Sequence, residues 1–185
     1  MPGVGVWLAS IEDVEPGEWP ALYAQMDKER QGRCDRHRRE IDKRRCILAD
    51  ALARRALSKG TDLAPEAISF GREPSGKPYA LGLDKHFSLS HSGSLALCAV
   101  AHFPVGADIQ RQRSISEPMI RRLARAGYEG TSDEDFFAWW VRQEAAGKMT
   151  GKGLSLRPIP EDLQFWDGVV KESDGAYFYA ICAPR

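Results

Sequence analysis

The chain has 185 residues, of which 43% are hydrophobic and 28% are charged, values usual for a folded globular protein. This composition excludes a disordered chain and a collagen-like repeat, and no apolar run approaches the roughly 20 residues that a membrane span needs. The N-terminal segment lacks the basic start and the long apolar run of a signal peptide. We therefore expect a cytoplasmic protein without a membrane partner, in which the four cysteines are free thiols.

The 26 basic and 26 acidic residues cancel, but the basic residues gather in one segment. Residues 28–59 contain twelve Lys and Arg against five Asp and Glu. A neutral protein with one basic segment is not suited to coat nucleic acid, and no aromatic residues alternate with the basic ones. We therefore expect no nucleic-acid partner. The segment is suited to hold one compact polyanion, such as a nucleotide phosphate.

In chain order, the first predicted element is a strand at residues 4–10, followed by a Pro- and Gly-containing loop at residues 16–20. Residues 35–59 form the longest helical pattern, because apolar residues recur there at helical spacing, and Gly60 ends it. The middle third is rich in strands. Its strand-like segments are AISF, FSLSHSG, SLALCAVA and VGADIQ.

The rest of the chain repeats this order of a helix and then strands. Helices are expected at Glu117–Ala126 and Asp133–Met149, with Asp133 as the cap of the second, and the strands LQFWDGVV and AYFYAIC follow. Because the order occurs twice, the sequence predicts an α+β fold of two similar halves. The halves are expected at residues 1–103 and 104–185.

Three oxygen-bearing side chains of the second half could meet at one point. Asp108 and Gln110 lie two apart on a predicted strand and therefore face the same side, and Glu144 lies on the predicted helix. Two carboxylates and an amide oxygen suit a hard cation such as Mg2+. The alternative, which spacing alone favours, is that Asp108 ends a strand at the surface and Glu144 is a solvated helix residue.

The helical phase of residues 133–149 predicts two neighbouring lines of side chains. The expected core line is Phe137, Val141, Ala145 and Met149. The adjacent line is Phe136, Trp140, Glu144 and Lys148. A Glu–Lys pair one turn apart beside bulky aromatic residues is either an ordinary helix pair or an acid–base or metal group next to a phosphate-binding lysine. Spacing leaves both open.

Arg45 lies on the stripe of the residue 35–59 helix that should face the core. A buried guanidinium needs an anionic partner, so Arg45 either extends to the surface or points into a cleft and binds a phosphate. Arg30 and Arg33, just before this helix, could converge on the same anion.

The segment FSLSHSG places Ser90 and His91 at a strand end. A serine-hydrolase site is rejected because the GxSxG motif is absent. His91 is then either a structural hydrogen-bonding residue or a donor to a phosphate. The Gly/Pro turn at residues 71–78, which contains Lys77 and Pro78, is by itself a weak loop signal.

Taken in order, these segments resemble the Sfp-like branch of the 4'-phosphopantetheinyl transferase superfamily. The resemblance covers about Arg30 to Ser155 and rests on GREPSGKPYA, FSLSHSG, VGADIQ and WWVRQEAAGKMTGKGLS. It implies an enzyme of the holo-[acyl-carrier-protein] synthase type. Such an enzyme moves the phosphopantetheine arm of coenzyme A to a serine of an apo acyl or peptidyl carrier protein, with Mg2+, and releases 3',5'-ADP. It also implies an intramolecular pseudo-dimer with the site between the halves, which favours a monomer.

The resemblance further implies the site residues. The metal ligands would be Asp108, Gln110 and Glu144, with Glu144 also the base for the carrier serine and Lys148 a stabiliser of the pyrophosphate. The residues expected to line the coenzyme A pocket are Arg30, Arg33, Arg45, Lys77, Pro78, Ser90 and His91.

Two positions depart from the family pattern: Gln110 stands where the family commonly has Glu, and Gln143 stands where it usually has Lys. We expect weaker Mg2+ binding or an altered metal preference from the first change. The second removes a positive charge close to the pyrophosphate. Together they motivate an alternative, a non-catalytic descendant that binds coenzyme A or a carrier protein.

Overall fold

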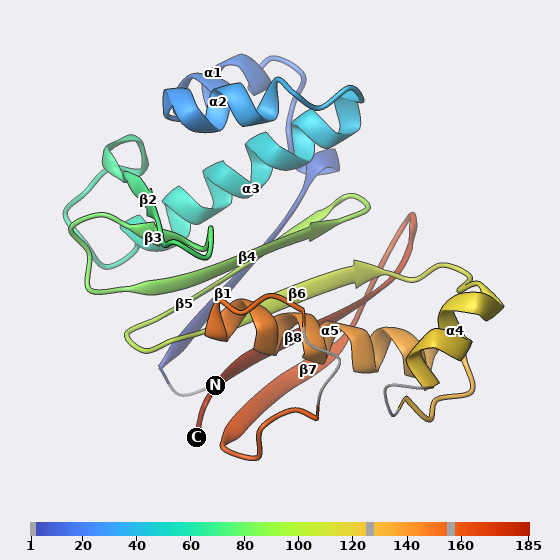
Figure 1. Ribbon diagram of the computed structural model, residues 1–185. Coiled ribbons are helices and arrows are strands. Elements are labelled where there is room, and N and C mark those ends of the chain that lie inside the picture. Colours follow the sequence, from blue (N-terminus) through green and yellow to red (C-terminus); the bar gives the residue numbers. More distant parts are fainter. Residues whose placement is uncertain (1–2, 125–127, 155–157) are drawn as a thin grey trace.

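The computed structural model describes residues 3–124, 128–154 and 158–185, and these ranges form a mixed helix and sheet fold (Figure 1). The expected α+β class is confirmed. The elements up to residue 101 are β1 (Val4–Ser10), η1 (Ile11–Asp13), α1 (Trp19–Ala24), α2 (Lys28–Cys34), α3 (Glu40–Ser58), η2 (Pro65–Ala67), β2 (Phe70–Arg72), β3 (Pro78–Ala80), β4 (His86–Ser92) and β5 (Leu95–Ala101). The later elements are β6 (Gly106–Arg111), α4 (Glu117–Ala124), α5 (Asp133–Thr150), β7 (Leu163–Glu172) and β8 (Gly175–Pro184).

The first sheet has the strand order β1-β5-β4, with both neighbours antiparallel to β5. Every residue of β5 is buried, which is why its sequence is an unbroken apolar run. Ala96, Cys98 and Val100 share one hydrophobic cluster with the buried side of α3. In Figure 1, α1, α2 and α3 lie together on this side of the sheet.

The second sheet has the order β6-β8-β7, again antiparallel throughout, and α5 packs across it. Helix α5 comes very close to β6 at Gly106, where a Cβ atom would overlap the carbonyl oxygen of Ala145. The backbone of Gly106 is not left-handed. Glycine is therefore required here for the close packing and not for its conformational freedom. The approach brings one face of β6 directly under α5.

The two sheets also pack against each other. Leu95 and Leu97 of β5 share a buried cluster with Ile109 of β6 and with Tyr177 and Ile181 of β8. The layers are therefore stacked in the order helix, sheet, sheet, helix. Side chains alternate along each strand, so one set packs against a helix and the other set packs against the opposite sheet. Asp108 and Gln110 belong to the set of β6 that faces α5.

Most predicted elements are present, and several boundaries differ. The helix predicted at residues 35–59 begins at Glu40, and two short helices, α1 and α2, precede it where none was predicted. Only Phe70 of AISF lies in a strand. Helix α5 is capped by Ser132 and not by Asp133, because the Ser132 hydroxyl and the Asp135 side chain form a reciprocal capping box.

The predicted end of the helix at Ala126 lies outside the described residues. Within the described ranges, none of the helices has the length and apolar character needed to cross a bilayer.

Candidate functional site

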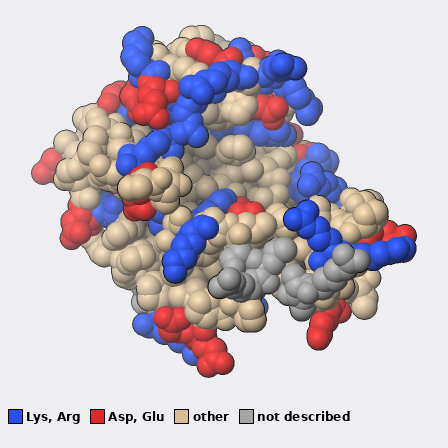
Figure 2. All heavy atoms as spheres, in the orientation of Figure 1, with Lys and Arg blue, Asp and Glu red and all other residues tan. Residues whose placement is uncertain are grey.

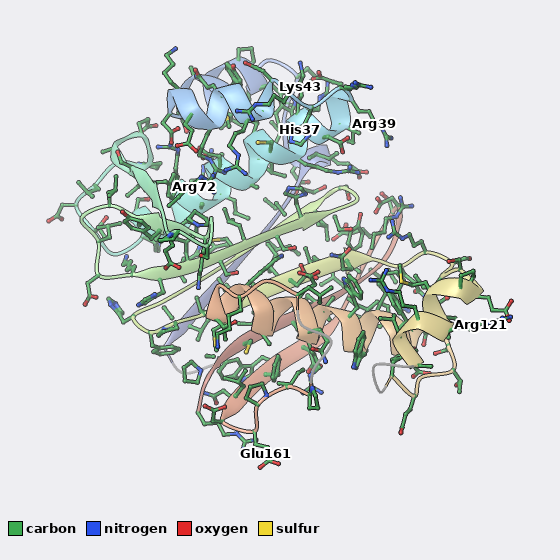
Figure 3. The ribbon with its side chains drawn as sticks, viewed as in Figure 1. His37, Arg39, Lys43, Arg72, Arg121 and Glu161 are labelled. Carbon is green, nitrogen blue, oxygen red and sulfur yellow. The ribbon has the colours of Figure 1, made fainter. Side chains whose placement is uncertain are left out.

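A cavity of about 630 Å3 opens between α2 and α3 on one side and α5 on the other. Figure 2 shows a hollow across this face, with basic side chains along its upper rim. Basic residues from α2, from the turn after it and from β2 form this wall of the cavity: Arg30, Arg33, Arg36, His37 and Arg72. Figure 3 shows that His37 and Arg72 lie above β4 in the same view.

The opposite wall contains the residues of β4, β6 and α5 on which the sequence analysis focused. They are Ser90, His91, Asp108, Gln110, Glu144 and Lys148. Basic residues therefore face a cluster of mixed acidic, amide and ammonium groups across one cavity, and the walls come from both parts of the chain. Such a lining is suited to an anionic ligand that also brings a cation.

Asp108 is the centre of the mixed cluster. Its side chain is only 1% exposed, yet three side chains donate to it. Its Oδ1 accepts from Ser90 Oγ at 2.6 Å and from Lys148 Nζ at 2.6 Å, and its Oδ2 accepts from Gln110 Nε2 at 3.1 Å. A buried carboxylate is stable only when it is paired and hydrogen-bonded in this way. The alternative that Asp108 ends a strand at the surface is wrong.

A row of serine hydroxyls joins the two sheets beside this cluster. Ser88 and Ser92 accept hydrogen bonds from the amides of Ala107 (2.9 Å) and Arg111 (3.0 Å), and Ser90 donates to Asp108. Residues two apart on a strand face the same side, so all three serines of β4 point at β6. We call this row the serine seam; it fixes the register of β4 against β6 and therefore places Asp108 beside Ser90.

Glu144 is partly buried at the cavity wall, on the same line of α5 as the aromatic residues Phe136 and Trp140. Burial first, and then the nearby charge of Asp108, raise the pKa of its carboxyl, while Lys148 lowers it. Two carboxylates close enough to repel each other favour a proton or a cation between them.

His91 is an exposed residue of β4, and the pKa of its ring is lowered, first by partial desolvation against the surrounding protein and then by the nearby cations Lys148 and Arg45. At neutral pH a neutral imidazole with one N–H donor is therefore favoured.

Two predicted pocket residues do not line this cavity. Arg45 pairs with Asp42 (Nη1 to Oδ1, 2.7 Å) and donates from Nε to the carbonyl oxygen of Gly93 at 2.6 Å, so its head is held at the turn after β4. Lys77 donates from Nζ to the carbonyl oxygen of Met149 at 2.8 Å, because the carbonyl groups that end α5 attract a cation. The other predicted residues, including Arg30, Arg33 and Pro78, are brought together.

Sequence reasoning missed the residues that hold the basic wall in place. Asp50 and Arg54 are fully buried on α3, and nothing in the helical pattern separated them from the exposed charges around them. It also missed Cys46 and Ala49, which line the cavity one turn apart on the same helix. The i,i+4 spacing of Asp50 and Arg54 was the available signal.

The donor set of the mixed cluster fits a hard divalent cation. Asp108 and Glu144 supply two carboxylates; burial raises the pKa of Glu144 most, and the charge of Asp108 raises it further by a repulsion that a cation would relieve. Among the described residues, no three His, Cys, Asp or Glu side chains gather as a metal site, so a third protein oxygen for the cation would come from the amide of Gln110. Its Nε2 donates to Asp108, and its Oε1 is then the atom left for a metal.

Comparison with known proteins gives a consistent result. A family model described as "4'-phosphopantetheinyl transferase, N-terminal" matches residues 13–103. The chain is 34% identical over 149 residues to a 4'-phosphopantetheinyl transferase of Bacillus subtilis, an alignment that covers 76% of this chain and 66% of the relative. It is 34% identical over 137 residues to the 4'-phosphopantetheinyl transferase Sfp of Bacillus subtilis strain 168, covering 69% and 61%.

A third relative, a 4'-phosphopantetheinyl transferase of Bacillus pumilus, is 35% identical over 136 residues, covering 69% of this chain and 58% of the relative. The chain thus spans 58% to 66% of the length of these three relatives.

Proposed function

Because the chain belongs to the 4'-phosphopantetheinyl transferase family, in its Sfp-like branch, we propose that it transfers the 4'-phosphopantetheine arm of coenzyme A to a carrier protein. The acceptor is a serine of an apo acyl or peptidyl carrier protein, the other product is 3',5'-ADP, and the enzyme is of the holo-[acyl-carrier-protein] synthase type. The observation that carries this proposal is the single cavity that sets a basic wall against the cluster around Asp108.

We propose further that residues 1–103 and 104–185 are two similar halves of an intramolecular pseudo-dimer. The strand orders support this, since β1-β5-β4 with α3 and β6-β8-β7 with α5 have the same arrangement of first, last and middle strand. In this arrangement the site lies between the halves. A single chain then supplies a whole site, so the protein would act as a monomer.

The basic wall is the place we assign to the phosphate groups of coenzyme A. Arg30 and Arg33 present guanidinium groups, which bind phosphate oxygens through paired N–H donors. From the opposite wall His91, as a neutral ring, donates one hydrogen bond without adding charge. Arg45 acts from outside the lining, because its bond to Gly93 fixes the turn that follows His91.

Asp108, Gln110 and Glu144 would hold Mg2+, which when bound supplies positive charge to the diphosphate. Lys148 donates to the carboxylate of Asp108, and its ammonium group can stabilise the negative charge that develops on the leaving phosphate. Stabilisation of this kind accelerates the reaction when it is stronger in the transition state than in the ground state.

In the proposed reaction, the serine oxygen of the carrier forms a bond to the β-phosphorus of coenzyme A while the bond from that phosphorus to the bridging oxygen breaks. The electron pair of the broken bond leaves on 3',5'-ADP. The serine proton passes to the Glu144 carboxylate, directly or through water. The raised pKa of Glu144 makes it a better proton acceptor than an ordinary surface carboxylate.

The test is to incubate the protein with coenzyme A, Mg2+ and a panel of apo carrier proteins and to weigh the carriers by mass spectrometry. We expect a mass gain of one phosphopantetheine arm on at least one carrier, and no gain on the same carrier when its acceptor serine is replaced by alanine. No gain on any carrier, from protein that is folded and binds coenzyme A, would refute the transfer activity.

A non-catalytic protein that binds coenzyme A or a carrier is the second candidate. The observation that favours it is that Lys148 and Gln110 already occupy the oxygens of Asp108, so the cluster is satisfied without a metal. This candidate predicts that coenzyme A binding, measured by calorimetry, is the same with Mg2+ and with a chelator. The transferase predicts tighter binding with Mg2+.

A further inference from the structure

A buried network of charges lies directly behind the basic wall of the cavity. Asp50 is 0% exposed and Arg54 is 2% exposed, both on α3. Arg54 donates from Nε to Asp50 Oδ2 at 2.5 Å and from Nη1 to the carbonyl oxygen of Ile68 at 2.5 Å. The second oxygen of Asp50 pairs with Nε of Arg30, which reaches in from α2. One buried carboxylate therefore sits between two guanidinium groups.

Arg30 is the member of this network that reaches the cavity. Its side chain is 14% exposed and lines the cavity, and its Nε lies within ion-pair distance of Asp50 Oδ1, although neither of these two buried atoms has a hydrogen-bond partner among the described residues. Its guanidinium also lies over the ring of Phe70, with Cζ 5.5 Å from the ring centroid. Two contacts of different kinds, one with a buried carboxylate and one with an aromatic ring, thus restrict the position of this group.

Arg33 provides the contrast. It lies one turn further along α2 and lines the same cavity, but its side chain is exposed, and within the described part of the chain it forms no ion pair. An arginine that is free to move loses rotamer entropy when it binds a phosphate, whereas a fixed one has lost it already on folding. The two arginines therefore differ in preorganisation while sharing helix, charge and cavity.

We propose that Asp50 is a positioning residue, which together with Phe70 holds the Arg30 guanidinium ready for a phosphate group of coenzyme A; this rests on the proposed function. A buried ion pair is a poor source of stability compared with apolar packing of the same volume. A role in placing one cavity side chain accounts for keeping charge in this core, where supporting contacts of a binding group have to be rigid.

The test is a double-mutant cycle on coenzyme A affinity, measured by calorimetry with Asp50→Asn, Arg30→Gln and the double variant. We expect Arg30→Gln to weaken binding by about tenfold or more, the loss of a charge-assisted hydrogen bond. Asp50→Asn should weaken binding by about threefold to tenfold, the entropy of ordering one long side chain. In the Arg30→Gln background, Asp50→Asn should change affinity by less than about twofold.

The matched control repeats the cycle with Arg33→Gln in place of Arg30→Gln. In the Arg33→Gln background, Asp50→Asn should weaken coenzyme A binding by the same factor as in the unmutated protein, because Asp50 does not hold Arg33. Since Asp50→Asn leaves Arg54 without its carboxylate and can unfold the protein, Phe70→Leu serves as a second probe. It keeps all the charges and should lower affinity in the Arg30 background but not in the Arg30→Gln background.

Three results would overturn the proposal. If Asp50→Asn lowers coenzyme A affinity equally in the unmutated protein and in the Arg30→Gln variant, Asp50 has a general structural role. If Asp50→Asn binds coenzyme A more tightly than the unmutated protein, the Asp50 charge only repels the ligand. Absence of coenzyme A binding to the unmutated protein would overturn this inference and the proposed function together. If the Asp50 and Arg30 substitutions are coupled in coenzyme A affinity but no carrier is modified, only the proposed function is refuted. If a carrier is modified but the two substitutions are not coupled, only the positioning role is refuted.

Discussion

Replacing Ser88 by alanine removes the hydroxyl that accepts the backbone amide of Ala107 across the serine seam. Ser88 is 4% exposed and Ala107 is 0% exposed, so water cannot take the place of the hydroxyl. A buried donor left without an acceptor costs about 1–3 kcal/mol. For a chain of this length, each kcal/mol lowers the melting temperature by about 2–4 °C, so we expect Ser88→Ala to melt roughly 2–12 °C below the parent protein.

Ser92→Ala is the matched control, because Ser92 makes the same kind of bond to the amide of Arg111 at an exposed position. Water can replace that hydroxyl, and the expected loss is within about 0.5 kcal/mol. The assay is thermal unfolding followed by circular dichroism without ligand, together with hydrogen exchange of the two amides. Equal losses for the two variants, or unchanged protection of the Ala107 amide, would show that the seam does not hold the sheets as we describe.

Glu144→Gln should lower carrier modification by about 10²–10⁴-fold while coenzyme A binding persists. Since burial and Asp108 raise the pKa of Glu144, this carboxyl favours the folded state below its unfolded pKa and loses that contribution as pH rises through its folded pKa. Glu144→Gln should therefore have a higher melting temperature than the parent protein near pH 8 but not below about pH 4. A difference in melting temperature between variant and parent that is the same at both pH values would contradict the assignment. Gln110→Glu adds a third carboxylate and should lower the Mg2+ concentration required for half-maximal transfer, whereas Gln112→Glu, two residues along the chain, should not. Gly106→Ala should cost about 1–3 kcal/mol in denaturant unfolding, because its methyl group overlaps the α5 backbone at Ala145; wild-type stability would refute the close approach.

The sequence predicted best where one pattern decides the structure. The alternation in residues 4–10 and the apolar run of β5 are strands, and the core line of α5 is buried as its spacing predicted. The cluster of Asp108 with Lys148 could also be predicted from the sequence, because the strand period and the helix period each place these residues on one side of their element. In these cases the local period and the tertiary environment agree.

The prediction was wrong where tertiary contacts outweigh the local pattern. Arg45 lies on the stripe expected to face the core, and its guanidinium was expected to extend to the surface or to enter a cleft. The guanidinium that is buried among the described residues is that of Arg54, nine residues later on the same helix, and its partners come from α3 and from the segment before β2. Helix α2 was missed because it is short and mostly polar, and its Arg30 is held by a contact from another helix. No helical period contains information about a partner that lies outside the helix.

The cavity has a thermodynamic consequence of its own, because its lining includes residues of both three-stranded sheets, from β4 in one and from β6 in the other. A molecule that fills it touches both sheets, and the whole of its affinity then opposes their separation during unfolding. At a ligand concentration of one hundred times Kd this coupling adds about 2.7 kcal/mol to the free energy of unfolding. The protein would thus resist heat and proteases best when a ligand of this cavity is abundant, and a falling supply of that ligand would expose the protein to degradation.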